Sequence, residues 1–349
     1  MTVKLSALAP LLTNDTLQLI VLPTEKCNFR CEYCYEDFEH DKMSSDTVGR
    51  LKKLIEHRAP KLRHLEVSWF GGEPLLAKEI IYDLNSHAIG LADSYGASFA
   101  SEITTNGFAL DFDTFERLCE LRVSSYQISL DGEGESHDRT RKLISGKGTF
   151  ERIWSNIIRM RESSRIFNVV LRLHVHRTNV QGIKSLLGLI ERELLGDPRF
   201  NIVLKPVGDW GGTSVKKLSL LGKEDSELAE IHRTVEQMGW HRTRRAIEID
   251  PPASNESSAA VHACYAARPN SLVIRSTGQL AKCTVAFSDP RNNVGYLERD
   301  GTIRLERDKM LQFMRGFESL SHEELTCPMH GMPKIAPGKV IFLAPVPAQ

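Results

Sequence analysis

The feature that most constrains the fold of this 349-residue chain is a repeated alternation of short apolar runs with longer segments of helical periodicity. The runs of strand character lie at residues 17–22, 65–70, 97–104, 124–130, 168–174 and 201–206. The helical patterns lie at residues 44–59, 80–95, 111–121, 150–163 and 183–195. Strands joined through helices form parallel sheets, because parallel neighbours need a crossover connection. The alternation predicts a parallel sheet with helices outside, closed or partly closed into a (β/α)6 barrel whose strand ends line one mouth.

Composition excludes several classes of protein. The chain has 45 basic and 45 acidic residues and no basic stripe, so we expect no nucleic-acid partner. No apolar run is long enough to span a membrane, and the N-terminus is a poor secretion signal. The seven cysteines are clustered and odd in number, which favours metal binding in a reducing cytoplasm over a disulfide framework.

The pattern changes after residue 212, following the segment Asp209-Trp-Gly-Gly. Residues 213–257 are charged and helical in character and end in a loop rich in proline and serine. Short strands at 271–275 and 279–284 then flank Gly278, which predicts a hairpin. We therefore predict a core domain at 1–212, a helical connector at 213–257 and a small α+β domain at 258–349.

Three cysteines follow the first predicted strand, Cys27, Cys31 and Cys34, with the spacing C-x3-C-x2-C. One interpretation is a structural zinc site, but zinc prefers four protein ligands and no fourth cysteine or histidine lies at zinc-finger spacing. Thiolates also bind iron–sulfur clusters. Three ligands on a four-iron cluster leave one iron open to a substrate or cofactor, so this loop is the expected centre of chemistry.

The cysteine loop and three further motifs together resemble the radical S-adenosylmethionine (SAM) superfamily. These motifs are Trp69-Phe-Gly-Gly-Glu-Pro, Thr104-Thr-Asn-Gly and Ser129-Leu-Asp-Gly, and the resemblance covers about residues 17–210. It implies a partial (β/α)6 barrel and a 4Fe–4S cluster on the three cysteines, whose open iron chelates the amino and carboxylate groups of SAM. Reductive cleavage of SAM would then yield a 5′-deoxyadenosyl radical that abstracts a substrate hydrogen.

The second and third motifs are interpreted as SAM contacts. Gly71 and Gly72 let the backbone approach a ligand closely. Glu73 can accept hydrogen bonds from a cationic amino group, although a tight turn with a solvated acid is the plain alternative. Thr105 and Asn106 precede a glycine turn, and a simple turn explains them as well as a ligand contact does.

Further SAM contacts are implied by the resemblance alone. Ser129 and Asp131, at the end of the fourth strand, would hold the carboxylate and ribose side of SAM. Arg141 matches a position that pairs with the SAM carboxylate, a role that suits a guanidinium group, and Arg139 competes for it. Tyr33 matches the aromatic residue that packs near the adenine.

The C-terminal cysteines suggest a second cluster. Cys264, Gly278 and Cys283 give C-x13-G-x4-C, which resembles the opening of the SPASM or shorter twitch extensions of peptide-modifying radical SAM enzymes. Only Cys327 remains beyond them, so two full auxiliary clusters are excluded by count and one auxiliary iron–sulfur cluster is expected. Its fourth ligand is open, with His330 as one candidate. The alternative is that these are buried thiols of a domain without a cluster.

These observations predict a radical SAM maturase that cross-links a ribosomally made precursor peptide through a C–C, ether or thioether bond. An electron donor such as flavodoxin or ferredoxin would serve it. Lys205 and Asp209 follow the sixth strand and border the expected cavity, where Asp209 can take up a proton. Alternatives are formylglycine formation as in sulfatase maturases, peptide epimerisation, small-molecule dehydrogenation and a non-enzymatic metal-binding scaffold.

Overall fold

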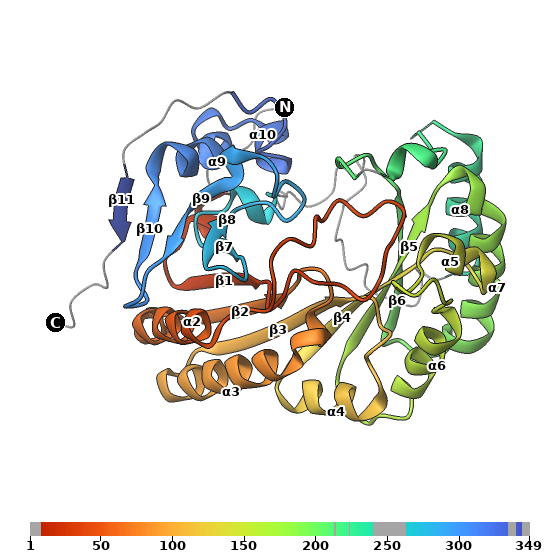
Figure 1. The fold of residues 1–349 in the computed structure, drawn as a ribbon, viewed down its shortest axis with the longest axis horizontal. Coiled ribbons are helices and arrows are strands. Elements are labelled where there is room, and N and C mark those ends of the chain that lie inside the picture. The colour runs from red at the N-terminus through yellow and green to blue at the C-terminus, as the bar shows by residue number, and fades with distance from the viewer. Residues whose placement is uncertain (1–7, 213, 223, 240–262, 334–339, 344–349) are drawn as a thin grey trace.

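The computed structural model describes residues 8–212, 214–222, 224–239, 263–333 and 340–343. Its centre is a sheet with the strand order β11-β10-β9-β8-β7-β1-β2-β3-β4-β5-β6 (Figure 1). The first six strands are β1 (Thr16–Val21), β2 (His64–Trp69), β3 (Ser98–Thr105), β4 (Val123–Leu130), β5 (Asn168–Val175) and β6 (Phe200–Pro206). The helices between them are α2 (Ser45–Arg58), α3 (Lys78–Tyr95), α4 (Phe112–Glu120), α5 (Glu135–Thr140), α6 (Phe150–Met160) and α7 (Val180–Leu194).

The predicted alternation is confirmed. Strands β1 to β6 pair in parallel in their order along the chain. Helix α2 begins where its capping residue predicts, because the Ser44 side chain accepts a hydrogen bond from the backbone N–H of Thr47. The prediction for 150–163 overshoots, since α6 ends at Met160, and the short helix α5 was not anticipated.

The sheet stays open, because β6 does not return to pair with β1. The free edge of β1 instead pairs in parallel with β7 (Ser271–Ile274), a strand some 250 residues later in the chain. Strand β8 (Gln279–Ala281) follows antiparallel, as the predicted hairpin requires, and Gly278 in the turn has a φ of +85°. The barrel is therefore partial, and the chain after β6 returns to add β7 at the free edge of β1.

The C-terminal part continues the same sheet. Strands β9 (Asn293–Leu297), β10 (Ile303–Glu306) and β11 (Val340–Leu343) extend it antiparallel. Helices α9 (Arg307–Ser319) and α10 (His322–Thr326) were not predicted. The division at residues 212 and 257 stays a prediction, but the two larger parts share one hydrogen-bonded sheet.

The predicted connector is only partly described. Helix α8 (Ser226–Gln237) buries Leu228, Ile231 and Val235, and lies beside α7. Residues 240–257 of the connector lie outside the described residues.

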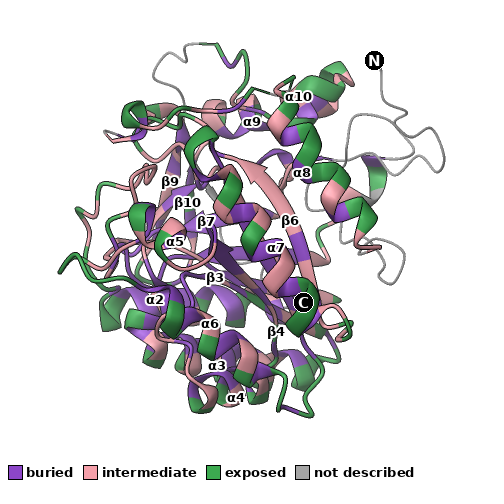
Figure 2. Cartoon of the chain, turned by 90° about the vertical axis from the view of Figure 1, so that its right-hand side faces the viewer, coloured by how far each residue is buried: buried purple, intermediate pink, exposed green. Residues whose placement is uncertain are grey.

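Apolar side chains from both sides of the sheet form the core, and exposed residues lie on the outer faces of the helices (Figure 2). The loop between β1 and α2 lies on the side of the sheet opposite α3 and α4 (Figure 1). Among the helices of the described residues, none combines the length and apolar character needed to cross a bilayer.

Candidate active site

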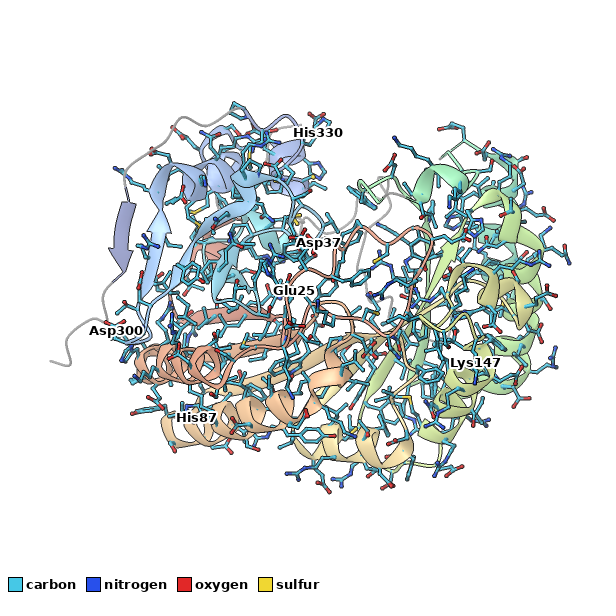
Figure 3. The ribbon with its side chains drawn as sticks, in the orientation of Figure 1. Glu25, Asp37, His87, Lys147, Asp300 and His330 are labelled. Carbon is cyan, nitrogen blue, oxygen red and sulfur yellow. The ribbon has the colours of Figure 1, made fainter. Side chains whose placement is uncertain are left out.

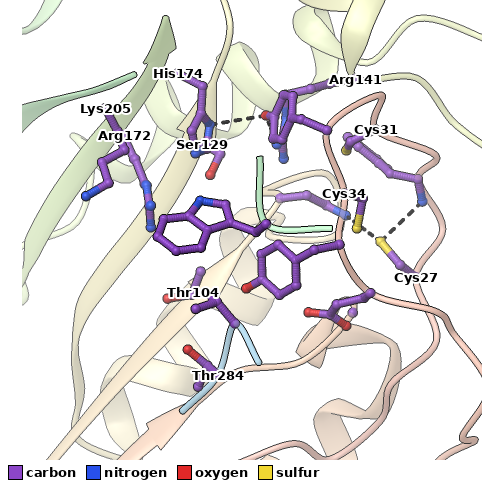
Figure 4. A pocket seen from close by; sticks show the side chains of 18 of the residues that line it. Cys27, Cys31, Cys34, Thr104, Ser129, Arg141, Arg172, His174, Lys205 and Thr284 are labelled. Carbon is purple, nitrogen blue, oxygen red and sulfur yellow. Dashed lines mark hydrogen bonds between the residues drawn. The ribbon is translucent and has the colours of Figure 1, made fainter. Parts of the chain in front are cut away.

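A cavity of about 310 Å³ opens at the carboxyl ends of the parallel strands. All six core strands, or the loops that follow them, contribute to its wall. Of the predicted site residues, those that line it are Cys27, Cys31, Tyr33, Cys34, Gly71, Gly72, Thr105, Asn106, Ser129, Arg141 and Lys205 (Figure 4). The predicted mouth of the barrel is thus where the motif residues meet.

Backbone hydrogen bonds hold the cysteine loop in place. Its N–H groups at Arg30 and Glu32 donate to the carbonyls of Lys142 and Thr140 at 2.9 and 3.1 Å. In the middle of the loop, Phe29 is buried and its ring packs edge-on against another phenylalanine ring. These contacts turn the three thiols toward one cavity.

The thiols lie in a setting that suits a cluster. Burial raises the pKa of Cys34 to about 12, and burial is also the main cause that raises the pKa values of Cys27 and Cys31. Buried thiols hold their protons until a metal replaces them. Within the residues that the structure describes, no three His, Cys, Asp or Glu side chains converge on a point for one metal ion. Each thiolate of a four-iron cluster binds a different iron, so such convergence is not required.

The two glycines of the second motif are required by space. Gly71 has a φ of +112°, and a Cβ atom there would lie 2.4 Å from the carbonyl oxygen of Thr24. A Cβ atom on Gly72 would lie 2.5 Å from the carbonyl oxygen of Lys26, directly before the first cysteine. Both therefore allow the strand β2 end and the cysteine loop to pack backbone against backbone.

Glu73 and Asp131 do not line the cavity. The Glu73 carboxylate is fully buried and accepts hydrogen bonds from Thr105 Oγ1 and the Asn106 N–H, both at 2.7 Å. Burial, its largest influence, raises the pKa of Glu73. Contact of Glu73 with a SAM amino group stays a prediction, and the geometry directly supports a role in shaping the turn at Thr105 and Asn106.

Asp131 is the centre of a buried polar network behind the cavity wall. It accepts hydrogen bonds from the Tyr33 hydroxyl at 2.8 Å and from Thr140 Oγ1 at 2.6 Å, and it lies 3.4 Å from His174 Nδ1. Burial opposes ionisation, but the His174 hydrogen bond and the Arg141 charge outweigh it and lower the pKa of Asp131. The network fixes the Tyr33 ring, which lines the cavity.

Of the two arginines considered for the SAM carboxylate, Arg141 is the one that reaches the cavity. Its Nη1 donates to the Tyr33 hydroxyl at 2.7 Å, and its buried Nε has no hydrogen-bond partner among the described residues. Arg139, its competitor in the sequence, is exposed and pairs with Glu135. A buried guanidinium with an unused donor is ready for an anionic ligand.

The two predicted proton carriers are separated. Lys205 lines the cavity, whereas Asp209 is exposed on the segment after β6 and its carboxylate accepts a hydrogen bond from the Gly211 N–H at 3.0 Å. His174 reaches the cavity, and His176, two residues on, is buried outside it. The role of Asp209 as a base stays a prediction.

Sequence reasoning missed Arg172, whose side chain enters the cavity from β5 (Figure 4). Its signal was available in the alternation of Leu171-Arg-Leu-His, where every second residue faces the barrel interior. A charged residue on the interior face of a barrel strand, where apolar residues are usual, indicates a candidate site residue.

The C-terminal cysteines lie beside the same cavity, since Thr284 and Val285, which follow Cys283, contribute to its wall. Burial raises the pKa of Cys283 to about 11, and the neighbouring charges of Cys264 and Cys327 add to the effect. These three thiols are therefore mutual neighbours, with Cys327 exposed. His330 is exposed and lies in the outer portion of the C-terminal part (Figure 3).

The sequence matches the Radical SAM superfamily over residues 21–190, which include the cysteine loop and strands β2 to β5. The chain carries a radical SAM domain. It is 26% identical over 238 residues to the Fe-coproporphyrin III synthase of Methanosarcina barkeri, covering 66% of this chain and 52% of that protein. It is 24% identical over 239 residues to the PqqA peptide cyclase of Gluconobacter oxydans, covering 68% of this chain and 62% of that protein. The chain thus spans between half and two thirds of the length of these enzymes.

Among solved structures, the fold is similar to anSMEcpe with bound AdoMet and the Kp18Cys peptide, with a TM-score of 0.64 and 18% identity. The match covers 81% of this chain and 78% of that one, so the similarity extends beyond the radical SAM domain into the C-terminal part.

A radical SAM domain implies a 4Fe–4S cluster and SAM, and the residues present fit both. Three thiols border one cavity, Gly72 leaves room for the loop that carries them, and the Nε of Arg141 is unpaired among the described residues.

Proposed function

We propose that this chain is a radical SAM peptide maturase that forms a side-chain cross-link in a ribosomally made precursor peptide. One observation carries the proposal. The cavity that contains the three thiols is also bordered by Thr284, Val285 and the exposed Trp210, so residues outside the SAM motifs are placed to contact a second ligand. The PqqA peptide cyclase similarity supports a peptide as that ligand.

The cluster and SAM, when bound, would supply reductive cleavage and a hydrogen-abstracting radical. The residues of the chain have the tasks of binding and orienting. Cys27, Cys31 and Cys34 would hold the cluster, and Arg141 would bind the SAM carboxylate. The Tyr33–Asp131 hydrogen bond holds the aromatic ring that would contact the adenine.

We further propose that Cys264, Cys283 and Cys327 bind one auxiliary iron–sulfur cluster that accepts the surplus electron of the product. Formation of a cross-link removes two hydrogens from the peptide, one as an atom and the other as a proton with an electron, so an electron acceptor is needed. Replacing Cys283 with alanine is expected to lower the iron content by about four atoms per chain. Unchanged iron content in this variant would reject the proposed auxiliary cluster and would leave the proposed SAM cluster untested by this result. We expect a small acidic redox protein such as flavodoxin or ferredoxin to supply the electron that cleaves SAM.

The deciding experiment incubates anaerobically reconstituted protein with a reductant, SAM and a precursor peptide encoded beside its gene, followed by mass spectrometry. A cross-link appears as a loss of two hydrogens and as fragments that stay joined. The same mass loss with an aldehyde that reacts with a hydrazide indicates formylglycine made from serine, whereas formylglycine made from cysteine also shows replacement of sulfur by oxygen. An unchanged mass with altered stereochemistry indicates epimerisation, and absence of 5′-deoxyadenosine formation would support a non-enzymatic scaffold.

A further inference from the structure

The wall of the cavity formed by β5 and β6 is basic. Arg172 and His174 are two residues apart on β5, and His174 is paired in register with Lys205 on β6. Because side chains alternate between the faces of a strand, these three enter the same space. Figure 4 shows Arg172 and Lys205 together on the side of the cavity away from the cysteines.

One nitrogen of the half-buried Arg172 guanidinium lacks a hydrogen-bond partner among the described residues. Its Nε is buried, and among the residues that the structure describes it has no hydrogen-bond partner. A buried donor without an acceptor costs free energy, and a buried charge costs more unless it is paired. A ligand with a negative group would satisfy Arg172 and remove that cost.

The neighbours of Arg172 do not neutralise its charge. Burial lowers the pKa of His174 to about 4 against the opposing effect of Asp131, so its imidazole is neutral near pH 7. Among the described lining residues the one carboxylic acid is Glu36, and it forms no hydrogen bond with the Arg172 Nε. The positive charge of Arg172 is therefore not paired with an acid among the described residues that line the cavity.

Arg172 is also distinct from the arginine expected to bind SAM. Arg141 lies against the cysteine loop, with its guanidinium 5.7 Å from the centre of the Phe29 ring and bonded to Tyr33. Figure 4 places Arg141 beside Cys31 and Arg172 across the cavity from it. Because Arg141 is the expected partner of the SAM carboxylate, Arg172 is available to bind the substrate.

We propose that Arg172, with Lys205 beside it, forms a carboxylate-binding site that selects an aspartate or glutamate side chain of the substrate peptide. This inference rests on the proposed function in taking the substrate to be a peptide. A guanidinium can hold a carboxylate through two parallel hydrogen bonds, which fixes the orientation of the peptide as well as its identity. The acidic residue would thereby position a neighbouring residue for hydrogen abstraction.

The test measures binding and does not require turnover. Acetyl-Gly-Asp-Gly-amide and acetyl-Gly-Asn-Gly-amide are titrated by calorimetry into the reconstituted protein with SAM bound. The aspartate peptide is expected to bind about 10- to 100-fold more tightly, the range of a charge-assisted hydrogen-bonded pair. Arg172→Gln is expected to abolish this preference, and Arg172→Lys to retain part of it, because lysine keeps the charge and loses the two-pronged geometry.

Two controls make the outcome decisive. Arg165→Gln, at an exposed arginine paired with Glu116, is expected to keep the full preference. SAM affinity, measured separately, is expected to be unchanged in Arg172→Gln. The proposal is overturned if wild-type protein binds both peptides equally, if the preference survives in both folded Arg172 variants, or if Arg172→Gln weakens SAM binding as strongly as peptide binding. A precursor that is left unmodified would instead count against the proposed maturase function, with the peptide preference unaffected.

Discussion

The buried ion pair between Arg275 and Glu25 connects the C-terminal part to the cysteine loop, and its removal should strongly destabilise the protein. Arg275 directly follows β7, and Glu25 lies two residues before Cys27. The two side chains are only 8% and 4% exposed. Arg275 Nε lies 3.1 Å from one carboxylate oxygen, and Ser276 donates to the other through its backbone and its hydroxyl at 3.2 and 3.0 Å.

Arg275→Met removes the cation and leaves the Glu25 carboxylate buried with only the Ser276 donors. Loss of one partner from a buried pair destabilises proteins by about 3–5 kcal/mol, because the remaining charge is uncompensated. We expect the free energy of unfolding to fall by that amount. Iron content should fall with it, since the affected loop carries the three cysteines proposed to bind the cluster.

The assay is urea unfolding followed by circular dichroism under anaerobic, reducing conditions. Arg165→Met removes an exposed pair and should cost less than about 1 kcal/mol. The double variant Glu25→Leu with Arg275→Met should lose less stability than Arg275→Met alone, because no buried charge remains unpaired. The reasoning is refuted if Arg275→Met is as stable as the Arg165→Met control, or if the double variant is no better than the single one.

Three further predictions concern the cavity. Gly72→Ala places a Cβ atom 2.5 Å from a backbone oxygen of the cysteine loop, so we expect the free energy of unfolding to fall by about 1–3 kcal/mol and less iron to be bound. Gly90→Ala, where a Cβ atom meets no atom within 4 Å, should keep both the stability and the iron content. The pKa of His174 is lowered from 6.5 to about 4 in the folded protein. The stabilising contribution of the neutral imidazole is therefore complete above pH 6.5 and is lost as the pH falls toward 4, by about 3 kcal/mol in total. His174→Gln should make the free energy of unfolding less dependent on pH across that window. Cys31→Ala should abolish SAM cleavage and lower the iron content by about four atoms per chain. Cys119→Ala, whose thiol bonds to a tyrosine hydroxyl at 3.2 Å outside the cavity, should retain SAM cleavage and all the iron. Equal loss in the two variants would contradict the assignment of the cluster loop.

Local patterns were sufficient for much of the fold. Periodicity predicted the order and type of the core elements, because a strand buried on both faces and an amphipathic helix differ within a dozen residues. The turn at Gly278 was predictable because a glycine between two short runs of strand character favours a hairpin. Helix α9 was not predicted although its apolar residues Met310 and Phe313 are three apart, because no side chain caps its start and Gly316 lies within it.

The candidate site was predicted unevenly. Residues in ordered motifs, such as Cys27 and Gly72, line the cavity as expected. Glu73 and Asp131 belong to the same motifs, yet their carboxylates are engaged by the protein behind the wall. Asp209 follows the correct strand but lies on an exposed segment outside the lining. A motif predicts roughly where a side chain lies. The direction in which that side chain points depends on the hydrogen-bond donors that other segments of the chain place beside it.

The sequence by itself determined the parallel core and the position of the cysteine loop after the first strand, because spacing and periodicity act over short distances along the chain. Only the tertiary structure decided that β7 pairs with β1, that Arg275 reaches Glu25 across 250 residues, and that the Arg172 Nε enters the cavity wall without a partner among the described residues. Such contacts depend on the register and twist of the whole sheet, which bring together segments whose local sequences carry no record of each other.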